Sequence, residues 1–291
     1  MKKIIISSDS CLDELKSVLR EKNIEFVPMV YILDKEYKDN FDSQDDYDNF
    51  YVQMRNGAMP TTSMLNIFEA ETYFRRIVKE YDCDIVHISL SSGLSGTYEN
   101  TLLASENVME KFPDNKIYVV DSLSATQGQN LLVNYALRQK EKGKTAQGIF
   151  NDLQEVKYNL QHWVYISDLF HLRRGGRVTA AKAVIGSMLK TKPILSMSST
   201  GKLDMKEVAM GGKKAIKTLF GKLEKYGYED KENNSIYLAH SHNLEEANEL
   251  KKLILKHYKN AVVEIKNIGP LIGAHTGPGA LGLLFFGKER V

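Results

Sequence analysis

Hydroxyl-bearing residues gather in three short segments, each placed directly after an apolar run that is typical of a buried strand. The segments are Ser7-Ser8-Asp9-Ser10, residues 91–97 and Asp121-Ser122-Leu123-Ser124. Each precedes a helical pattern, and the free N–H groups at a helix start favour a negatively charged ligand. Because the carboxyl ends of parallel strands meet at one edge of a sheet, we expect these segments to lie together. Serine caps helices routinely, yet three such segments, joined by the similar Pro60-Thr61-Thr62-Ser63, indicate an anion site.

A basic segment and a histidine loop could complete this site. Arg173, Arg174 and Arg177 surround a Gly-Gly pair, which suits a turn that brings guanidinium groups to a carboxylate or phosphate. The same arginines could equally form a basic surface loop. His275 lies within residues 269–279, where glycines and prolines frame it. We expect a fixed loop that offers the imidazole as a hydrogen-bond donor.

Standard nucleotide and metal motifs are missing from the sequence. Gly211-Gly212-Lys213 lacks both the first glycine and the hydroxyl of a phosphate-binding P-loop. The two cysteines, Cys11 and Cys83, form no metal-ligand spacing, and no zinc-protease pattern occurs. The sequence therefore predicts no metal and no cofactor.

A rival hypothesis is a serine hydrolase. Residues 93–96 come within one residue of the nucleophile elbow G-x-S-x-G, because the second glycine arrives one position early. Ser95 would be the nucleophile and His275 the base, with Asp9 or Asp121 orienting the imidazole.

The elements that position these residues divide the chain into two parts. Up to about residue 165, buried strands at residues 4–7, 24–33, 85–90 and 116–120 alternate with helical patterns. This alternation predicts an α/β domain with a largely parallel, doubly wound sheet. Beyond it, residues 193–208 read as two strands joined by a tight turn at Thr200-Gly201, which requires antiparallel neighbours. We expect residues 1–165 to form the first domain, and residues 166–291 to form a second α/β domain with a mixed or antiparallel sheet.

Composition narrows the class of protein. A chain of 291 residues favours two domains, and a net charge of +2 gives no reason to expect nucleic acid as a partner. The apolar run after Met1-Lys2-Lys3 is too short for a signal peptide, and no segment is apolar enough to span a membrane. We expect a cytoplasmic protein with reduced thiols and no integral membrane association.

The motifs taken together resemble the DegV family, in order and over essentially the whole chain. They are Ser7-Ser8-Asp9-Ser10, Pro60-Thr61-Thr62-Ser63, residues 91–97, Leu172-Arg173-Arg174-Gly175-Gly176-Arg177, Lys192-Pro193-Ile194-Leu195 and residues 269–279. The resemblance implies a protein that binds a long-chain fatty acid as the lipid-carrying subunit of a bacterial fatty acid kinase. A separate ATP-binding subunit would phosphorylate the acyl carboxylate, and this chain would have no catalysis of its own.

The same resemblance assigns residues to the head group. It implies that Thr62, Ser95 and His275 bind the fatty acid carboxylate. Residues expected in the vicinity of the head group are Ser63, Gly96, Arg173, Arg174, Arg177, Gly273 and Thr276. The family has a proline-containing version of the segment after Thr62, whereas this chain has Ser63-Met64-Leu65-Asn66, which puts the start of the following helix in doubt.

The acyl chain should supply most of the affinity. Burying about fourteen methylenes at ~0.8 kcal/mol each contributes roughly 11 kcal/mol of favourable binding free energy, from which the cost of ordering the ligand must be subtracted. We expect the tail to enter an apolar pocket, mainly in the second domain, whose predicted residues are Phe170, Ile185, Met188, Leu189, Ile194 and Phe285. These residues could also be ordinary core positions.

Overall fold

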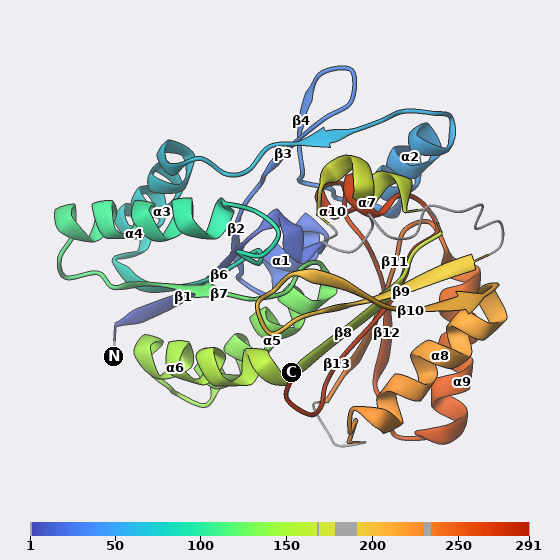
Figure 1. The fold of residues 1–291 in the computed structure, drawn as a ribbon. Coiled ribbons are helices and arrows are strands. Elements are labelled where there is room, and N and C mark those ends of the chain that lie inside the picture. The colour runs from blue at the N-terminus through green and yellow to red at the C-terminus, as the bar shows by residue number, and fades with distance from the viewer. Residues whose placement is uncertain (1, 168, 178–190, 230–233, 291) are drawn as a thin grey trace.

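The computed structural model describes residues 2–167, 169–177, 191–229 and 234–290 (Figure 1). The helix expected at residues 180–190, and with it the predicted pocket residues Ile185, Met188 and Leu189, lies outside the described residues. The fold is mixed α/β, with a parallel sheet in the N-terminal part and a mixed sheet in the C-terminal part. The predicted fold class is therefore confirmed.

The first sheet, sheet A, is a four-stranded parallel sheet with strand order β2-β1-β6-β7. Its strands are β1 (Lys3–Asp9), β2 (Glu25–Val27), β6 (Cys83–Ser89) and β7 (Ile117–Asp121). The helices that precede or follow its strands in the chain are η1 (Ser10–Leu12), α1 (Lys16–Glu21), α3 (Ile67–Tyr81), α4 (Thr97–Lys111), α5 (Gln127–Glu141) and α6 (Ala146–Val156).

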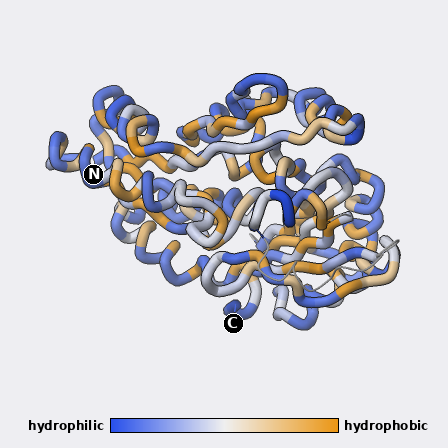
Figure 2. Tube along the Cα trace, turned by 45° about the horizontal axis from the view of Figure 1, so that its top comes forward, coloured by the Kyte–Doolittle hydropathy of each residue, from blue (hydrophilic) through white to orange (hydrophobic). Residues whose placement is uncertain are grey.

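Alternate residues of the central strands face different helix layers. Ile5 and Ile85 pack with the apolar faces of α3 and α4, whereas Ile6 and Val86 pack with α5 and α6. Successive side chains of a strand point to opposite faces, so a nearly continuous apolar run is buried on both sides. Figure 2 shows the hydrophobic stretches inside the molecule and hydrophilic stretches along the outer helices.

A small antiparallel sheet, sheet B, follows sheet A in the chain and has the order β4-β3-β5. Its strands are β3 (Val30–Ile32), β4 (Glu36–Lys38) and β5 (Thr61–Thr62), and α2 (Gln44–Arg55) lies between β4 and β5 in the sequence. The single strand expected at residues 24–33 is wrong. Pro28 has no N–H to donate to a ladder, and the chain leaves sheet A there to start β3 in sheet B.

The third sheet, sheet C, has six strands in the order β10-β9-β8-β13-β11-β12. Its strands are β8 (Leu160–Tyr165), β9 (Thr191–Met197), β10 (Leu203–Met210), β11 (Ile236–His240), β12 (Val263–Asn267) and β13 (Leu281–Phe286). Neighbours are antiparallel except β11 and β12. The remaining helices are η2 (Lys157–Asn159), α7 (Phe170–Gly175), α8 (Gly212–Lys225), α9 (Leu244–His257) and α10 (Pro270–Thr276).

The two large sheets share one hydrophobic core. One face of sheet C packs against α8 and α9. Its other face contributes Val164, Leu195 and Leu284 to the same cluster as Ile6 of sheet A, and α5 lies between the two sheets (Figure 1). Strand β8 belongs to sheet C although its residues 160–165 fall within the predicted first domain. The domain boundary near residue 165 stays a prediction.

Within the described part of the chain, no helix combines the length and the apolar character needed to cross a bilayer.

Candidate functional site

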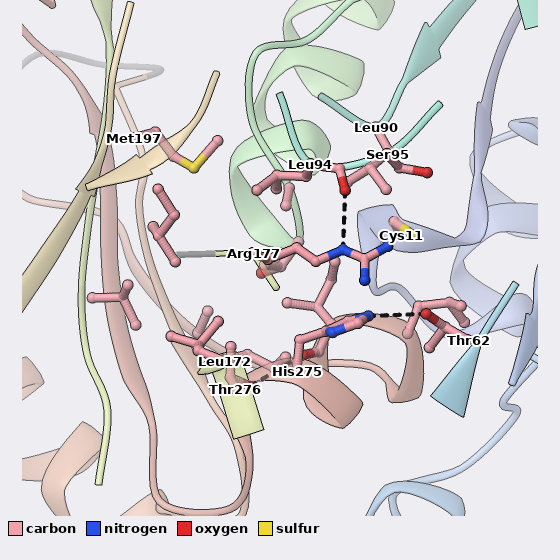
Figure 3. Close-up of a pocket in the computed structure, with 18 of the residues that line it drawn as sticks. Cys11, Thr62, Leu90, Leu94, Ser95, Leu172, Arg177, Met197, His275 and Thr276 are labelled. Carbon is pink, nitrogen blue, oxygen red and sulfur yellow. Dashed lines mark hydrogen bonds between the residues drawn. The ribbon is translucent and has the colours of Figure 1, made fainter. Parts of the chain in front are cut away.

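A narrow cavity lies where the loops of sheet A, the strand β5, the helix α10 and the inner face of sheet C meet (Figure 3). The cavity volume is about 80 Å³, within about 840 Å³ of empty space that includes solvent at the open end. Most lining residues are apolar: Cys11, Met29, Met64, Leu90, Leu94, Ala125, Val164, Leu172, Met197, Leu203, Ala239, Ile268, Leu271, Ile272 and Gly282. Such a slot suits a flexible hydrocarbon chain better than a bulky ring system.

Polar groups concentrate at the end of the cavity near β5. Thr62, Ser63, Ser95, Arg177, His275 and Thr276 line this end, and two further polar residues, Thr126 and His162, also line the cavity. Ser63 and Arg177 are also exposed to solvent, so the polar end is the open end. In Figure 3, Met197 of sheet C lies on the opposite side of the cavity from Thr62 and Ser95.

Thr62 and His275 form a direct hydrogen bond across two parts of the chain. Thr62 is held by antiparallel pairing with Tyr31, and His275 lies on α10, whose first turn begins with Pro270. The distance from Thr62 Oγ1 to His275 Nε2 is 2.9 Å (Figure 3). Burial, with the positive charges of Arg177 and Arg174, lowers the pKa of His275 to about 4. The imidazole is therefore neutral at pH 7 and acts as a hydrogen-bonding group rather than as a cation.

Gly175 fixes the position of this imidazole. A Cβ atom added at Gly175 would collide with Nδ1 of His275, and its distance to Cε1 would be 3.1 Å. The C-terminal end of α7 therefore packs directly against the histidine ring.

Ser95 belongs to a hydroxyl pair at the start of α4. Its Oγ lies 2.9 Å from Thr97 Oγ1 and accepts a 3.2 Å hydrogen bond from the Thr97 N–H. Thr97 Oγ1 also accepts from the Leu65 N–H at 3.3 Å, which ties the loop before α4 to the segment after Thr62. The doubtful helix start after Thr62 is resolved by Asn66, which caps α3 in a capping box with Glu69, so no proline is needed there.

The three arginines have different positions. Arg177 lines the cavity, and its Nε donates to the Leu94 carbonyl at 3.3 Å. Arg174 donates to the Met59 and Pro60 carbonyls at 3.2 and 2.7 Å, so it holds the chain just before β5. Arg173 is exposed and does not line the cavity. Of the three, Arg177 is the side chain placed to reach a head group.

Two of the predicted head-group residues pack behind the cavity rather than along it. Gly96 precedes α4, and a Cβ atom added there would lie 3.1 Å from Met64 Sδ. Gly273 faces Tyr51 and Phe50, because an added Cβ atom would collide with the Tyr51 hydroxyl and approach a Phe50 ring carbon to 3.1 Å. Both glycines allow close packing around the site.

The structure places the predicted acyl-chain residues away from the cavity. Ile194 and Phe285 are buried in the cluster beneath α8 and α9, on the far face of sheet C, and Phe170 is 49% exposed on α7. Among the described residues, none of the three lines the cavity. Ile194 and Phe285 belong to strands that reach the cavity, but their side chains lie on the opposite face of the sheet, since side chains alternate along a strand.

The residues that line the sheet side of the cavity belong to the other face of sheet C. Val164, Met197, Ala239 and Gly282 occupy the positions whose side chains face α5 and sheet A. Along β9 and β13, side chains on both faces of the sheet are buried. In β11 every residue is buried, so alternation could not reveal which residues face the cavity.

A hydrolase triad is not assembled in the described residues. The Ser95 hydroxyl is hydrogen-bonded to Thr97, whereas the His275 ring is hydrogen-bonded to Thr62. Asp9 is buried between strands, where it accepts from the Leu90 and Cys11 N–H groups at 2.7 and 3.1 Å. Asp121 accepts from the Ser92 N–H at 3.1 Å and the Ser92 hydroxyl at 2.5 Å.

The expected gathering of three anion-binding loops is therefore only partly realised. Residues 7–10 and 121–124 are internally bonded and buried, and burial raises the pKa of Asp9. The loop at residues 91–97 contributes Leu94 and Ser95 to the cavity. Among the described residues, no group of three or more His, Cys, Asp or Glu side chains is placed to hold a metal ion.

Both the sequence and the fold of this chain match known proteins. A family model described as "Uncharacterised protein, DegV family" matches residues 2–288. A DegV domain-containing protein of Clostridium perfringens (strain 13 / Type A) is 39% identical over 291 residues, which cover 100% of this chain and 99% of that protein.

Two solved structures share the whole fold. A DegV lipid binding protein from Thermotoga maritima is 28% identical with a TM-score of 0.85, covering 99% of this chain and 100% of that chain. DegV from Bacillus subtilis, described as a fatty acid binding protein, is 27% identical with a TM-score of 0.85 and the same coverage. The chain studied here belongs to the DegV family.

Proposed function

We propose that this protein binds one long-chain fatty acid, with the tail in the narrow cavity and the carboxylate at Thr62, Ser95 and His275. The observation that carries the proposal is an apolar slot closed by sheet C at one side and lined by hydroxyl and imidazole groups at its open end. The fatty acid binding and lipid binding functions of the Bacillus subtilis and Thermotoga maritima proteins support it.

The polar end meets the requirement that a buried carboxylate imposes. An anion taken out of water without partners costs several kcal/mol, so it needs hydrogen-bond donors. Thr62 and Ser95 have hydroxyl groups that can turn toward a carboxylate, and neutral His275 can donate from one ring nitrogen. Arg177 adds a positive charge at the opening. In this arrangement the tail supplies the affinity and the polar groups supply the orientation.

We further propose that the open polar end presents the carboxylate to a separate ATP-dependent kinase subunit, which forms an acyl phosphate. Phosphoryl transfer depends mainly on positioning and on charge stabilisation, and a fixed carboxylate at an opening provides the positioning. The nucleotide and its metal would arrive with the partner. A pull-down that recovers an ATP-binding kinase subunit, and acyl phosphate formation only when both proteins are present, would support this role.

The direct test of fatty acid binding is native mass spectrometry of the protein purified from bacteria. We expect a bound mass that matches a long-chain fatty acid, and loss of this mass after delipidation. Added hexadecanoate should restore it and raise the melting temperature, because a ligand that binds only the folded state stabilises it. Protein that stays empty and takes up neither hexadecanoate nor octadecenoate would end the proposal.

Binding should also shift the titration of His275. In the free protein its pKa lies at about 4 because the ring is buried beside Arg177 and Arg174. A carboxylate at hydrogen-bond distance favours the protonated ring, so the pKa of His275 should rise on loading, and the ring should take up its proton at a higher pH in the complex than in the free protein. NMR titration of the imidazole in the delipidated and loaded protein measures this shift. His87, whose pKa burial lowers to about 3 and which does not line the cavity, is the control, and an equal shift of both rings would contradict the assignment.

A further inference from the structure

Gly282 is an unusual residue for its place in sheet C. It lies inside β13, paired with Val164 of β8 on one side and Ala239 of β11 on the other. All three residues line the cavity. The middle of this wall therefore has no side chain, and one of its flanking residues has only a methyl group.

Glycine within a strand weakens the strand, so its presence calls for a cause. A left-handed backbone is not the cause, because the φ angle of Gly282 is not positive. A β-bulge is not the cause, because the register with β8 and β11 runs through Gly282 without a shift.

Close packing by the protein is not the cause either. A Cβ atom added at Gly282 would meet Leu284 Cδ1 at 3.4 Å and the Cβ and carbonyl oxygen of Ala239 at 3.6 Å, which are ordinary van der Waals distances. By contrast, a Cβ atom at Gly93 or Gly201 would collide with neighbouring atoms. The remaining cause of a strand glycine is the close approach of a ligand.

We propose that Gly282 and Ala239 form a trough in the cavity wall that receives the distal methylenes of the acyl chain, so that Gly282 sets the longest chain admitted. This inference rests on the proposed fatty acid binding. With the carboxylate at Thr62 and Ser95, the tail runs toward sheet C, whose Met197 lies across the cavity in Figure 3. A side chain at position 282 occupies the space that the end of a long tail needs.

The test is a chain-length series from decanoate to octadecanoate, measured by calorimetry on delipidated wild type, Gly282→Ala and Gly282→Val. Each methylene kept out of the cavity should weaken binding about fourfold. For Gly282→Val we expect hexadecanoate and octadecanoate to bind about tenfold or more weakly, while decanoate changes by less than about twofold. Gly282→Ala should show the same trend with a smaller amplitude.

The matched control is Gly221→Ala on α8, where an added Cβ atom meets nothing within 4 Å. It should leave the whole series unchanged. If Gly282→Val unfolds, Gly282→Ala decides the question, since its added methyl group has ordinary contacts.

Three results separate the possible failures. Wild type that binds no chain of any length defeats the proposed function itself. Wild type that binds, with a series unchanged by both Gly282 variants, defeats only the assignment of Gly282. A uniform loss at every chain length also overturns it, because a residue that limits length must discriminate between chains.

Discussion

Thr62→Val should weaken the binding of hexadecanoate by about 10- to 100-fold. A hydrogen bond to a charged group contributes ~1.5–3 kcal/mol, and each 1.4 kcal/mol of binding free energy is about a factor of ten in affinity. Valine has a similar shape but no hydroxyl, so the carboxylate loses a donor and His275 loses its 2.9 Å partner. Thr62 is partly buried on a two-residue strand, and valine suits a strand. The fit of valine to the strand should limit the fall in melting temperature that loss of the His275 hydrogen bond causes in the delipidated protein.

A matched variant and a matched ligand make this test specific. Thr61→Val alters the adjacent, exposed threonine and should leave hexadecanoate binding unchanged. Hexadecanol has the same tail without the carboxylate, and its affinity should be similar for wild type and Thr62→Val. If Thr62→Val binds hexadecanoate as wild type does, the head group does not rest on Thr62. If it loses hexadecanol as well, the effect lies in the cavity walls.

The sequence predicted well those structural features that depend on a few adjacent residues. Serine three residues before an acidic side chain is typical of a helix start, and Ser43 with Asp46 forms the capping box that begins α2. The strands around Thr200-Gly201 form the antiparallel pair β9 and β10, as expected. Caps and tight turns depend on a few adjacent residues, so their chemistry can be read directly from the sequence.

The site was harder to predict because it depends on contacts between distant segments. Thr62 and His275 are 213 residues apart and meet through a hydrogen bond that no spacing reveals. The resemblance to the DegV family, not periodicity, pointed to them. Asp9 shows the converse: it follows a buried strand, like a ligand residue, but it holds Leu90 and Cys11 in place.

The acyl-chain residues show a third limit. Ile194 and Leu195 are adjacent and both fully buried, yet they belong to different hydrophobic clusters. Sheet C is covered on both faces, so hydrophobicity alone cannot show which residue faces the ligand. Gly282 could not be predicted as a cavity residue for a related reason, because a residue without a side chain gives no hydrophobic signal in the sequence.

The loop that carries Ser95 is held against sheet C by two glycines. The Ser91 hydroxyl donates to the Gly201 carbonyl at 2.8 Å. Gly201 has φ of +70° in the turn between β9 and β10. A Cβ atom added at Gly93 would collide with the Gly201 carbonyl group and lie 2.8 Å from the Lys202 nitrogen. Two backbones thus touch here, and this contact sets the position of Leu94 and Ser95 relative to Met197 and Leu203.

Gly93→Ala should therefore lower the free energy of unfolding by about 1–3 kcal/mol, because the added methyl group meets backbone atoms that cannot move aside without breaking the contact. Fatty acid binding should fall with it, since Leu94 and Ser95 follow directly in the chain. Denaturant unfolding of the delipidated protein measures the first effect. Gly221→Ala adds the same methyl group to an open helix position and should stabilise slightly, by up to about 1 kcal/mol. If Gly93→Ala were as stable as wild type, the turn between β9 and β10 would not be what holds the Ser95 loop over the cavity.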